Sequence, residues 1–257
     1  MKKYLILFLV VVIILCNVYN IVESYENNYE IIYKKIDNIS IKLIDDIWSK
    51  DFKNRFITHE PYTNIKLKEL LEDLPNNSYI IDAGAHVGDT GLYLAKILDD
   101  KYKKKNIKVI MIEPDKTKIN FINNMAKLNN LNNIATKNIG ISDKKGKAKI
   151  DKTTHPGGWK IIENNSKGNI IIDTLDNICN NLNISLIHLD VEGMEYKCLL
   201  GSQNILKNTK YVMIELNGIS NNRNNEINIL KKNSFIEFKD NKIKKENGNV
   251  LFIKNLL

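Results

Sequence analysis

The segment IIDAGAHVGDTGLYLA, at residues 80–95, constrains the fold of this chain more than any other. An apolar run ends at Asp82, three glycines follow, and an apolar helix-like stretch comes next. A buried strand joined to a helix by a glycine-rich turn is typical of α/β proteins that bind nucleotide-like ligands, because such a turn lets the backbone approach the ligand closely. We therefore expect a ligand site at residues 82–89.

Strand-like and helix-like segments alternate from residue 79 onward. Helices of this length between strands predict a mostly parallel sheet with helices on both faces. Residues 143–162 are expected to form a loop with short strands, and residues 235–255 a terminal antiparallel hairpin that inserts one strand at a sheet edge. The expected strands are residues 79–85, 108–115, 133–142, 185–193 and 211–218, and the expected helices are residues 88–100, 116–130, 194–206 and 224–233.

The most apolar segment lies within residues 1–24, where two lysines precede the run from residue 4 to residue 22. Its length is close to the roughly 20 residues that cross a bilayer. Two interpretations remain open: an uncleaved signal anchor, or a signal peptide that is cleaved after Ser24. Because lysines precede the run and glutamates follow it, we expect the rest of the chain on the non-cytoplasmic side, anchored to the membrane or, after cleavage, secreted.

Residues 25–75 are expected to form a helical stalk, or N-terminal helices docked on the main domain. Apolar side chains between Ile32 and Ile47 recur at spacings of four, three, four and four residues, which predicts one helix. A second helix is expected after Pro61, with leucines on its apolar face. The main domain is then expected over residues 76–257.

The formal charge of +8 arises largely from lysine clusters at residues 101–105 and 144–152. Such clusters are typical of solvated loops, and no arginine-rich or aromatic-interleaved stripe accompanies them, so we expect no nucleic-acid partner. The three cysteines form neither a CxxC pair nor a Cys/His cluster, so the sequence predicts no zinc site, and no metal ligand is among the candidate site residues.

The glycine spacing separates the possible ligands. Gly84, Gly88 and Gly91 lack the close Gly-x-Gly pair of a dinucleotide site, and the Gly-Lys-Ser/Thr of a P-loop is absent. Asp82 at the strand end would repel a pyrophosphate but suits a cationic group, such as the amine of a methionine moiety. A nucleoside is favoured because Glu113 ends the next strand and can accept hydrogen bonds from both ribose hydroxyls.

Two later loops add candidates. Asp143, next to Ser142, can accept a hydrogen bond from an adenine amino group, or it is an ordinary turn residue. The loop at residues 155–159 carries a histidine and Trp159. It either covers the pocket of a second substrate, the acceptor, or is a bare turn.

Together these motifs resemble the FkbM family of S-adenosylmethionine-dependent methyltransferases, which belong to class I. All class I methyltransferases share the glycine turn, whereas the string Asp-Val-Glu-Gly-x-Glu at residues 190–195 is specific to this family. The resemblance covers roughly residues 60–215. The matching segments are residues 60–63, 81–90, 112–115, 141–143, 174–176, 189–195, 199–201 and 214–215.

This resemblance implies a class I methyltransferase fold with a seven-stranded, Rossmann-like sheet, and S-adenosylmethionine as the cofactor. It implies that the glycine turn holds the methionine end, Glu113 the ribose and Asp143 the adenine. Two positions depart from the usual pattern of the family, which has Asn at residue 86 and Lys at residue 188, where this chain has histidines. The cofactor-binding candidates are Asp82, Gly84, His86, Gly88, Glu113, Ser142 and Asp143.

Methyl transfer requires an acceptor oxygen aligned with the methyl group and a residue that takes its proton. Asp190 and Glu192 end the strand at residues 185–193, beside the expected cofactor. His188 shares a strand face with Asp190 because side chains alternate, so the two can act as base and orienter. His188 can equally be a hydrogen-bonded core residue. We predict Asp190, His188 and Glu192 as the catalytic candidates.

The sequence thus predicts an S-adenosylmethionine-dependent O-methyltransferase. Its resemblance to the family suggests that the acceptor is a hydroxyl on a sugar or another small molecule. One alternative is a catalytically inactive, membrane-anchored binding protein with the same fold. The other is an NAD-dependent reductase, which the missing close glycine pair and the lack of a suitably placed Tyr-x-x-x-Lys dyad disfavour.

Overall fold

The computed structural model describes residues 29–34, 38–154, 158–163, 168–216, 222–240 and 248–255. The apolar segment predicted as an anchor or signal peptide lies outside these residues. Within them, no helix combines the length and the apolar character needed to span a bilayer.

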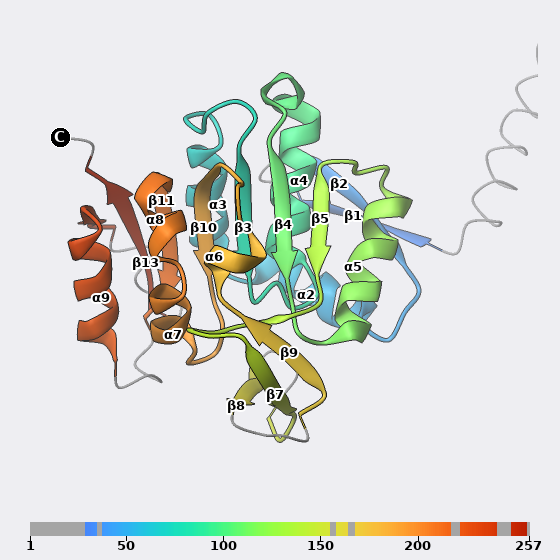
Figure 1. Cartoon of the computed structure of the whole chain (residues 1–257). Coiled ribbons are helices and arrows are strands. Elements are labelled where there is room, and N and C mark those ends of the chain that lie inside the picture. The colour runs from blue at the N-terminus through green and yellow to red at the C-terminus, as the bar shows by residue number, and fades with distance from the viewer. Residues whose placement is uncertain are drawn as a thin grey trace, which may run out of the picture.

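A seven-stranded sheet forms the centre of the described structure (Figure 1). Neighbouring strands from β11 to β5 run parallel, whereas β13 is inserted antiparallel between β11 and β12. This confirms the predicted α/β sheet, mostly parallel with a C-terminal antiparallel hairpin. In order across the sheet the strands are β12 (Phe235–Phe238), β13 (Asn249–Lys254), β11 (Tyr211–Glu215), β10 (Ile184–Leu189), β3 (Tyr79–Ala83), β4 (Lys108–Ile112) and β5 (Ile134–Lys137).

The sheet is buried between two apolar cores because strand side chains alternate between its faces. On β3, Ile80 packs in one core and Ile81 in the other. The first core is covered by α2 (Ser49–Thr58), α3 (Pro61–Leu70), α4 (Asp89–Lys101) and α5 (Lys116–Leu128). The second is covered by α6 (Leu175–Ile178), α7 (Glu195–Leu200), α8 (Gln203–Asn208) and α9 (Arg223–Lys232). A short 3₁₀ helix, η1 (Lys103–Lys105), follows α4.

The single helix predicted around residues 32–47 is wrong, because β1 (Tyr29–Lys34) and β2 (Ile39–Ile44) form an antiparallel hairpin there. Ile39, Ile41 and Leu43 are buried at every second position of β2, so the apolar residues follow the strand period as well as the helical one. The hairpin is docked on α5: the backbone N–H of Lys42 donates to Oδ1 of Asn129 at 2.7 Å, and Nδ2 of Asn129 donates to the carbonyl of Lys42 at 2.8 Å. The helix predicted after Pro61 is confirmed as α3.

Two elements predicted as continuous are divided. Residues 133–142 form β5 and then β6 (Gly140–Ile141), which belong to different sheets. Between the two strands, the side chain of Asn138 donates to the carbonyls of Glu113 and Pro114. The helix predicted over residues 194–206 is divided into α7 and α8 at Gly201. A Cβ at Gly201 would lie 2.3 Å from the carbonyl oxygen of Ser142, so this close approach requires glycine.

A second, four-stranded sheet extends from the carboxyl ends of the central strands (Figure 1). Its strands, in order, are β6, β9 (Ile170–Asp173), β7 (Gly146–Asp151) and β8 (Lys160–Glu163). The short strands expected within residues 143–162 are therefore confirmed as β7 and β8. The inner face of this small sheet contributes one wall of the cleft described below.

Candidate active site

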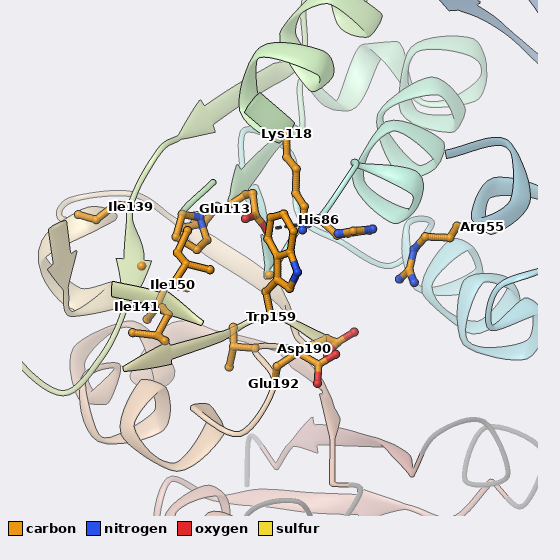
Figure 2. A pocket seen from close by; sticks show the side chains of 16 residues that line it. Arg55, His86, Glu113, Lys118, Ile139, Ile141, Ile150, Trp159, Asp190 and Glu192 are labelled. Carbon is orange, nitrogen blue, oxygen red and sulfur yellow. Dashed lines mark hydrogen bonds between the residues drawn. The ribbon is translucent and has the colours of Figure 1, made fainter. Parts of the chain in front are cut away.

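A cleft of about 620 Å³ lies at the carboxyl ends of β3, β4 and β10. Ends of parallel strands meet at one edge of a sheet, and ligands of α/β proteins bind there. The cleft brings together five residues predicted from the sequence: Gly84, His86, Glu113, Asp190 and Glu192. Figure 2 shows Glu113 and His86 on one side of the cleft and Asp190 with Glu192 on another.

One end of the cleft is apolar. Ile139 and Ile141 follow β5, and Ile150 and Ile161 come from the inner face of the small sheet. Together with Trp159 they form a surface that suits a flat, weakly polar group such as a nucleobase. Asp143 lies outside the lining of the cleft and is exposed.

Trp159 closes the cleft between the small sheet and the N-terminal part of the chain (Figure 2). Its ring lies edge-on to Trp48, with centroids 6.0 Å apart, and the ammonium of Lys118 lies 4.3 Å from its centre. Trp48 directly precedes α2, and Lys118 is on α5. Of the loop predicted at residues 155–159, Trp159 lines the cleft, while residues 155–157 lie outside the described part, so a cover over the acceptor pocket stays a prediction.

Glu113 is buried and held by the backbone around it. It accepts hydrogen bonds from the N–H of His86 at 3.1 Å and from the N–H of Asp115 at 2.8 Å. Burial raises the pKa of Glu113 to about 7, although the charge of Lys118 acts in the opposite direction. Glu113 therefore ties the glycine turn to the end of β4 and presents a carboxyl group to the cleft.

His86 connects the glycine turn to α2. Its backbone has a φ of 49°, a left-handed conformation that is uncommon for a residue with a side chain. Its Nε2 lies 2.6 Å from a carboxylate oxygen of Asp51, and its ring packs edge-on to Trp48. Burial lowers the pKa of His86, which opposes the effect of Asp51, so the neutral ring is favoured. The turn thus depends on a contact with a helix that precedes the main domain in sequence.

The His188–Asp190 pair predicted from the strand pattern does not form as a hydrogen bond among the described residues. Nδ1 of His188 instead lies 2.8 Å from Oδ1 of Asp82 on the neighbouring strand β3, and both side chains are buried. The reason is the sheet register, which places His188 directly beside Asp82. Close packing also fixes Asp82 on its other side, since a Cβ at Gly91 would lie 2.6 Å from Oδ2 of Asp82.

A second, smaller chamber of about 250 Å³ adjoins the cleft. Four residues line both cavities: Arg55, Gly84, His86 and Asp190. His188 and Asp82 line the chamber and are absent from the described lining of the cleft. We call this cavity the small chamber.

Asp190 lines both the cleft and the small chamber. Its Oδ1 is buried and has no hydrogen-bond partner among the described residues. Burial, with Asp190 and Glu195 nearby, raises the pKa of Glu192 to about 7. The backbone of Glu192 is also left-handed, with a φ of 52°. The tight turn after β10 therefore concentrates negative charge at the edge of the cleft.

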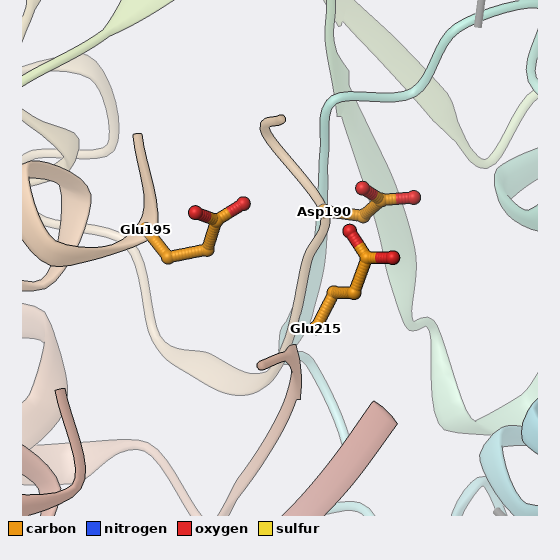
Figure 3. A group of neighbouring side chains, drawn as sticks. All are labelled: Asp190, Glu195 and Glu215. Atoms are coloured by element: carbon orange, nitrogen blue, oxygen red, sulfur yellow. The ribbon is translucent and has the colours of Figure 1, made fainter. Parts of the chain in front are cut away.

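Carboxylate oxygens of Asp190, Glu195 and Glu215 lie within 4.8 Å of one another (Figure 3). Oxygen atoms at this spacing are able to coordinate a hard cation. One oxygen of Glu195, however, already accepts hydrogen bonds from the N–H groups of Val191 and Gly193, at 3.2 and 3.1 Å. These two hydrogen bonds give Glu195 a structural role, since they hold the turn before α7. We therefore assign no metal to the three carboxylates.

The remaining predicted cofactor residues lie away from the described cavities. Gly88 begins α4 with a φ of 80°, and a Cβ there would lie 2.9 Å from Ile122, so its role is to bring α4 close to α5. Ser142 is buried and donates to Oδ1 of Asp143 at 3.1 Å; it also contacts Glu163. The structure thus places Gly88 and Ser142 outside the lining of the cleft, where they pack against neighbouring elements.

Arg55 and Lys118 line the cleft but were not predicted as site residues. Arg55 lies on α2, where its Nε donates to Asp89 at 3.1 Å. Neither residue belongs to a motif, and helix residues of their type are usually solvated, so the sequence carried no signal for them.

The family comparison identifies the fold and the site together. The model of the methyltransferase FkbM domain matches residues 82–240, which is more than half of the chain. The chain belongs to the FkbM methyltransferase family. The match begins at Asp82 and includes Glu113, Asp190 and Glu192, so the recognised domain contains most of the cleft.

One solved structure agrees with this FkbM assignment at the level of the fold. Methyltransferase FkbM from Methylobacillus flagellatus KT matches with a TM-score of 0.50 and 17% identity, over 82% of this chain and 56% of that chain. This FkbM chain thus spans little more than half the length of that relative. A methyltransferase from Geobacter sulfurreducens matches with a TM-score of 0.48 and 14% identity, over 80% of this chain and 86% of that chain. Fibrillarin from Aeropyrum pernix, solved with natively bound S-adenosyl-L-methionine, matches with a TM-score of 0.43 and 10% identity, over 74% of each chain. No curated protein sequence matches the chain.

Proposed function

We propose that this FkbM methyltransferase uses S-adenosylmethionine to methylate a hydroxyl oxygen on a sugar or another small molecule. The observation that carries the proposal is the cleft, in which a glycine turn, a buried carboxyl at the end of β4 and an unpartnered carboxylate at the end of β10 converge.

The residues present fit the cofactor. Gly84 has a φ of 82°, and a Cβ there would lie 1.7 Å from the carbonyl oxygen of Asp190, so only glycine lets the turn after β3 pack against the segment after β10 at the edge of the cleft. Glu113 would accept the ribose hydroxyls, and the isoleucines beside Trp159 would hold the adenine. The sulfonium of the cofactor supplies an electrophilic methyl group.

The chain itself must position the acceptor and take its proton. Asp190 is the best placed residue for this step, because it lines both cavities and its Oδ1 has no hydrogen-bond partner among the described residues. Glu192 adds a carboxyl whose pKa of about 7 suits proton transfer near neutral pH. Asp190 thus acts as the base, and Arg55, which lines the same cavities, orients polar groups of the acceptor.

Calorimetry with the full-length chain in detergent tests the proposal. We expect S-adenosylmethionine and S-adenosylhomocysteine to bind, and NADH not to bind. Glu113→Ala should weaken the binding of both adenosyl ligands by about 1–3 kcal/mol, the usual loss for a hydrogen bond to a charged group. The exposed Glu72→Ala provides a control with the same chemical change and should leave affinity unaltered. Tight NADH binding without a response to S-adenosylmethionine would contradict the assignment.

The proposal extends to the membrane, and the apolar run at residues 4–22 supports this part. An uncleaved run would hold the enzyme at a bilayer, with its catalytic domain on the non-cytoplasmic side. Carbonate extraction of the full-length chain, followed by N-terminal sequencing, tests it. Recovery of a soluble product that begins at Tyr25 would show a cleaved signal peptide instead.

A further inference from the structure

The outer face of the small sheet, which faces away from the cleft, combines apolar with basic side chains. Ile162 on β8 is 49% exposed, and Ile171 on β9 is 55% exposed. The strand between them, β7, places Lys149 beside Ile162 and Lys147 beside Ile171, and both lysines are exposed. We call these four residues, Lys147, Lys149, Ile162 and Ile171, the outer patch.

Strand alternation separates the outer patch from the cleft. On β7, Ala148 and Ile150 belong to the apolar core of the inner face, and Ile150 lines the cleft. No residue of the outer patch is in the described lining of the cleft. The two isoleucines therefore contribute neither to this core nor to the site, and their joint exposure is typical of an interaction surface.

We infer that the outer patch docks on the surface of a bilayer that contains anionic lipids. Lysines near such a surface are attracted by its negative potential, and apolar side chains beside them enter the boundary between headgroups and acyl chains. The exposed lysines extend beyond the patch, since Lys144 and Lys145 precede β7 and Lys160 shares the outer face with Ile162.

The charge of the outer patch is not consumed by the ion pairs of the small sheet. Lys152 pairs with Asp115, with Nζ and Oδ2 2.6 Å apart, and its ammonium lies 4.1 Å from the ring centre of Trp159 in the cleft wall. Glu163 pairs with Lys197 on α7. Both pairs lie apart from the lysines of the outer patch, whose charge remains to attract an anionic surface.

Other occupants match the outer patch less well. The two arginines of the chain lie on α2 and α9, and a surface without arginine or aromatic residues is a poor match for nucleic acid, to whose phosphates isoleucine adds no contact. A second copy of the chain would bring lysines against lysines if the same patch met itself, which costs free energy.

The short connection to the apolar run also favours a bilayer. The run ends at residue 22 and β1 begins at Tyr29, so the intervening residues 23–28 would span at most about 20 Å when fully extended. An anchored chain would thus hold its domain against the headgroups. This step rests on the anchored form of the proposed function, whereas the steps from exposure and charge hold for a cleaved chain as well.

A fluorescent label on the outer patch tests the inference in the full-length chain. Cys16→Ser leaves the buried Cys179 and Cys198, and Ile171→Cys then provides the site for an environment-sensitive nitrobenzoxadiazole label. The chain is mixed with vesicles of phosphatidylcholine alone or of equal parts phosphatidylcholine and phosphatidylglycerol. With the anionic vesicles we expect fluorescence to rise at least about twofold and spin-labelled lipids to quench it. About 1 M NaCl should reverse most of the rise.

Matched variants separate the outer patch from general effects of charge and exposure. The same label at Ile236→Cys, a residue 58% exposed on the edge strand β12, should not respond. Lys147→Glu with Lys149→Glu should abolish the response at residue 171, whereas the same reversal at the exposed Lys101 and Lys104 should leave most of it. If the first pair does not fold, as its thermal melt would show, Lys147→Gln with Lys149→Gln replaces it. All variants that fold should bind S-adenosylhomocysteine as the unaltered chain does.

The outcomes separate this inference from the proposed function. A chain that stays on the vesicles while residues 171 and 236 respond alike would overturn the inference and leave the anchor intact. An equal response to neutral and anionic vesicles would also overturn it, as would a response to RNA or polyglutamate in place of vesicles. A cleaved, soluble chain whose residue 171 still responds to anionic vesicles would support the inference without the anchor. Loss of S-adenosylhomocysteine binding by the unaltered chain would count against the proposed function alone.

Discussion

Replacement of Gly84 by alanine tests whether the glycine turn positions the site as the structure indicates. Gly84 has a φ of 82°, and its missing Cβ would lie 1.7 Å from the carbonyl oxygen of Asp190. Ordinary C···O contacts are near 3.3 Å, so the segment after β10 would have to move by about 1.5 Å. That segment carries Asp190 and Val191 into the cleft.

The expected cost has two parts. A residue with a Cβ in a left-handed conformation costs about 1–2 kcal/mol, and forced overpacking costs about 1–3 kcal/mol more. We therefore expect Gly84→Ala to lower the free energy of unfolding by about 2–5 kcal/mol. Because the displaced segment lines the cleft, affinity for S-adenosylhomocysteine should fall at least tenfold in the protein that remains folded.

Urea unfolding and calorimetry measure the two effects. Gly146→Ala in β7 is the matched control, since its Cβ would meet only the side chain of Ile172, at an ordinary 3.6 Å. It should be neutral or stabilise by about 0.5–1 kcal/mol, as expected for a strand glycine. The reasoning would be refuted if Gly84→Ala were as stable as the control and bound the ligand normally.

Three further predictions follow from the same structure. Phe52 is fully buried, with its ring 5.2 Å from that of Phe56, so Phe52→Ala should lower the free energy of unfolding in urea by about 3–5 kcal/mol. The control Ile47→Ala, at a residue that is 81% exposed, should lower it by less than about 0.5 kcal/mol. Equal effects of the two substitutions would contradict the docking of α2. The pKa of Glu113 is raised to about 7, and the ionised carboxylate accepts hydrogen bonds from ribose hydroxyls more strongly than the neutral form. Ligand affinity should therefore increase between about pH 6 and pH 8 in the unaltered chain. If the affinity of Glu113→Gln increased over the same pH range, the titration would belong to another group. Asp190→Asn should reduce methyl transfer on the order of 100-fold with little change in ligand affinity, and unaltered turnover would exclude Asp190 as the base.

The elements around the glycine turn were predictable because their signals are local. An apolar run of strand length, a glycine turn and a helical period follow one another in the sequence, and β3, α4, β4 and α5 form as expected. The carboxyl ends of these strands then had to meet at one edge, which placed Gly84, Glu113 and Asp190 in one cleft. The same reasoning gave the wrong result for the β1–β2 hairpin, because its isoleucines fit the strand period and the helix period alike. Only the docking of the segment on α5 decides between strand and helix.

The contacts of the site, in contrast, depended on the tertiary structure. The sequence determined that His188 lies near the end of a strand, two residues before Asp190, but the register between β10 and β3 pairs His188 with Asp82. Arg55 reaches the cavities from α2, and its position follows from packing that no sequence period encodes. Local patterns specify which segments form strands and which residues end them, whereas the partner of each buried charge is set by strand register and helix docking between segments far apart in the chain.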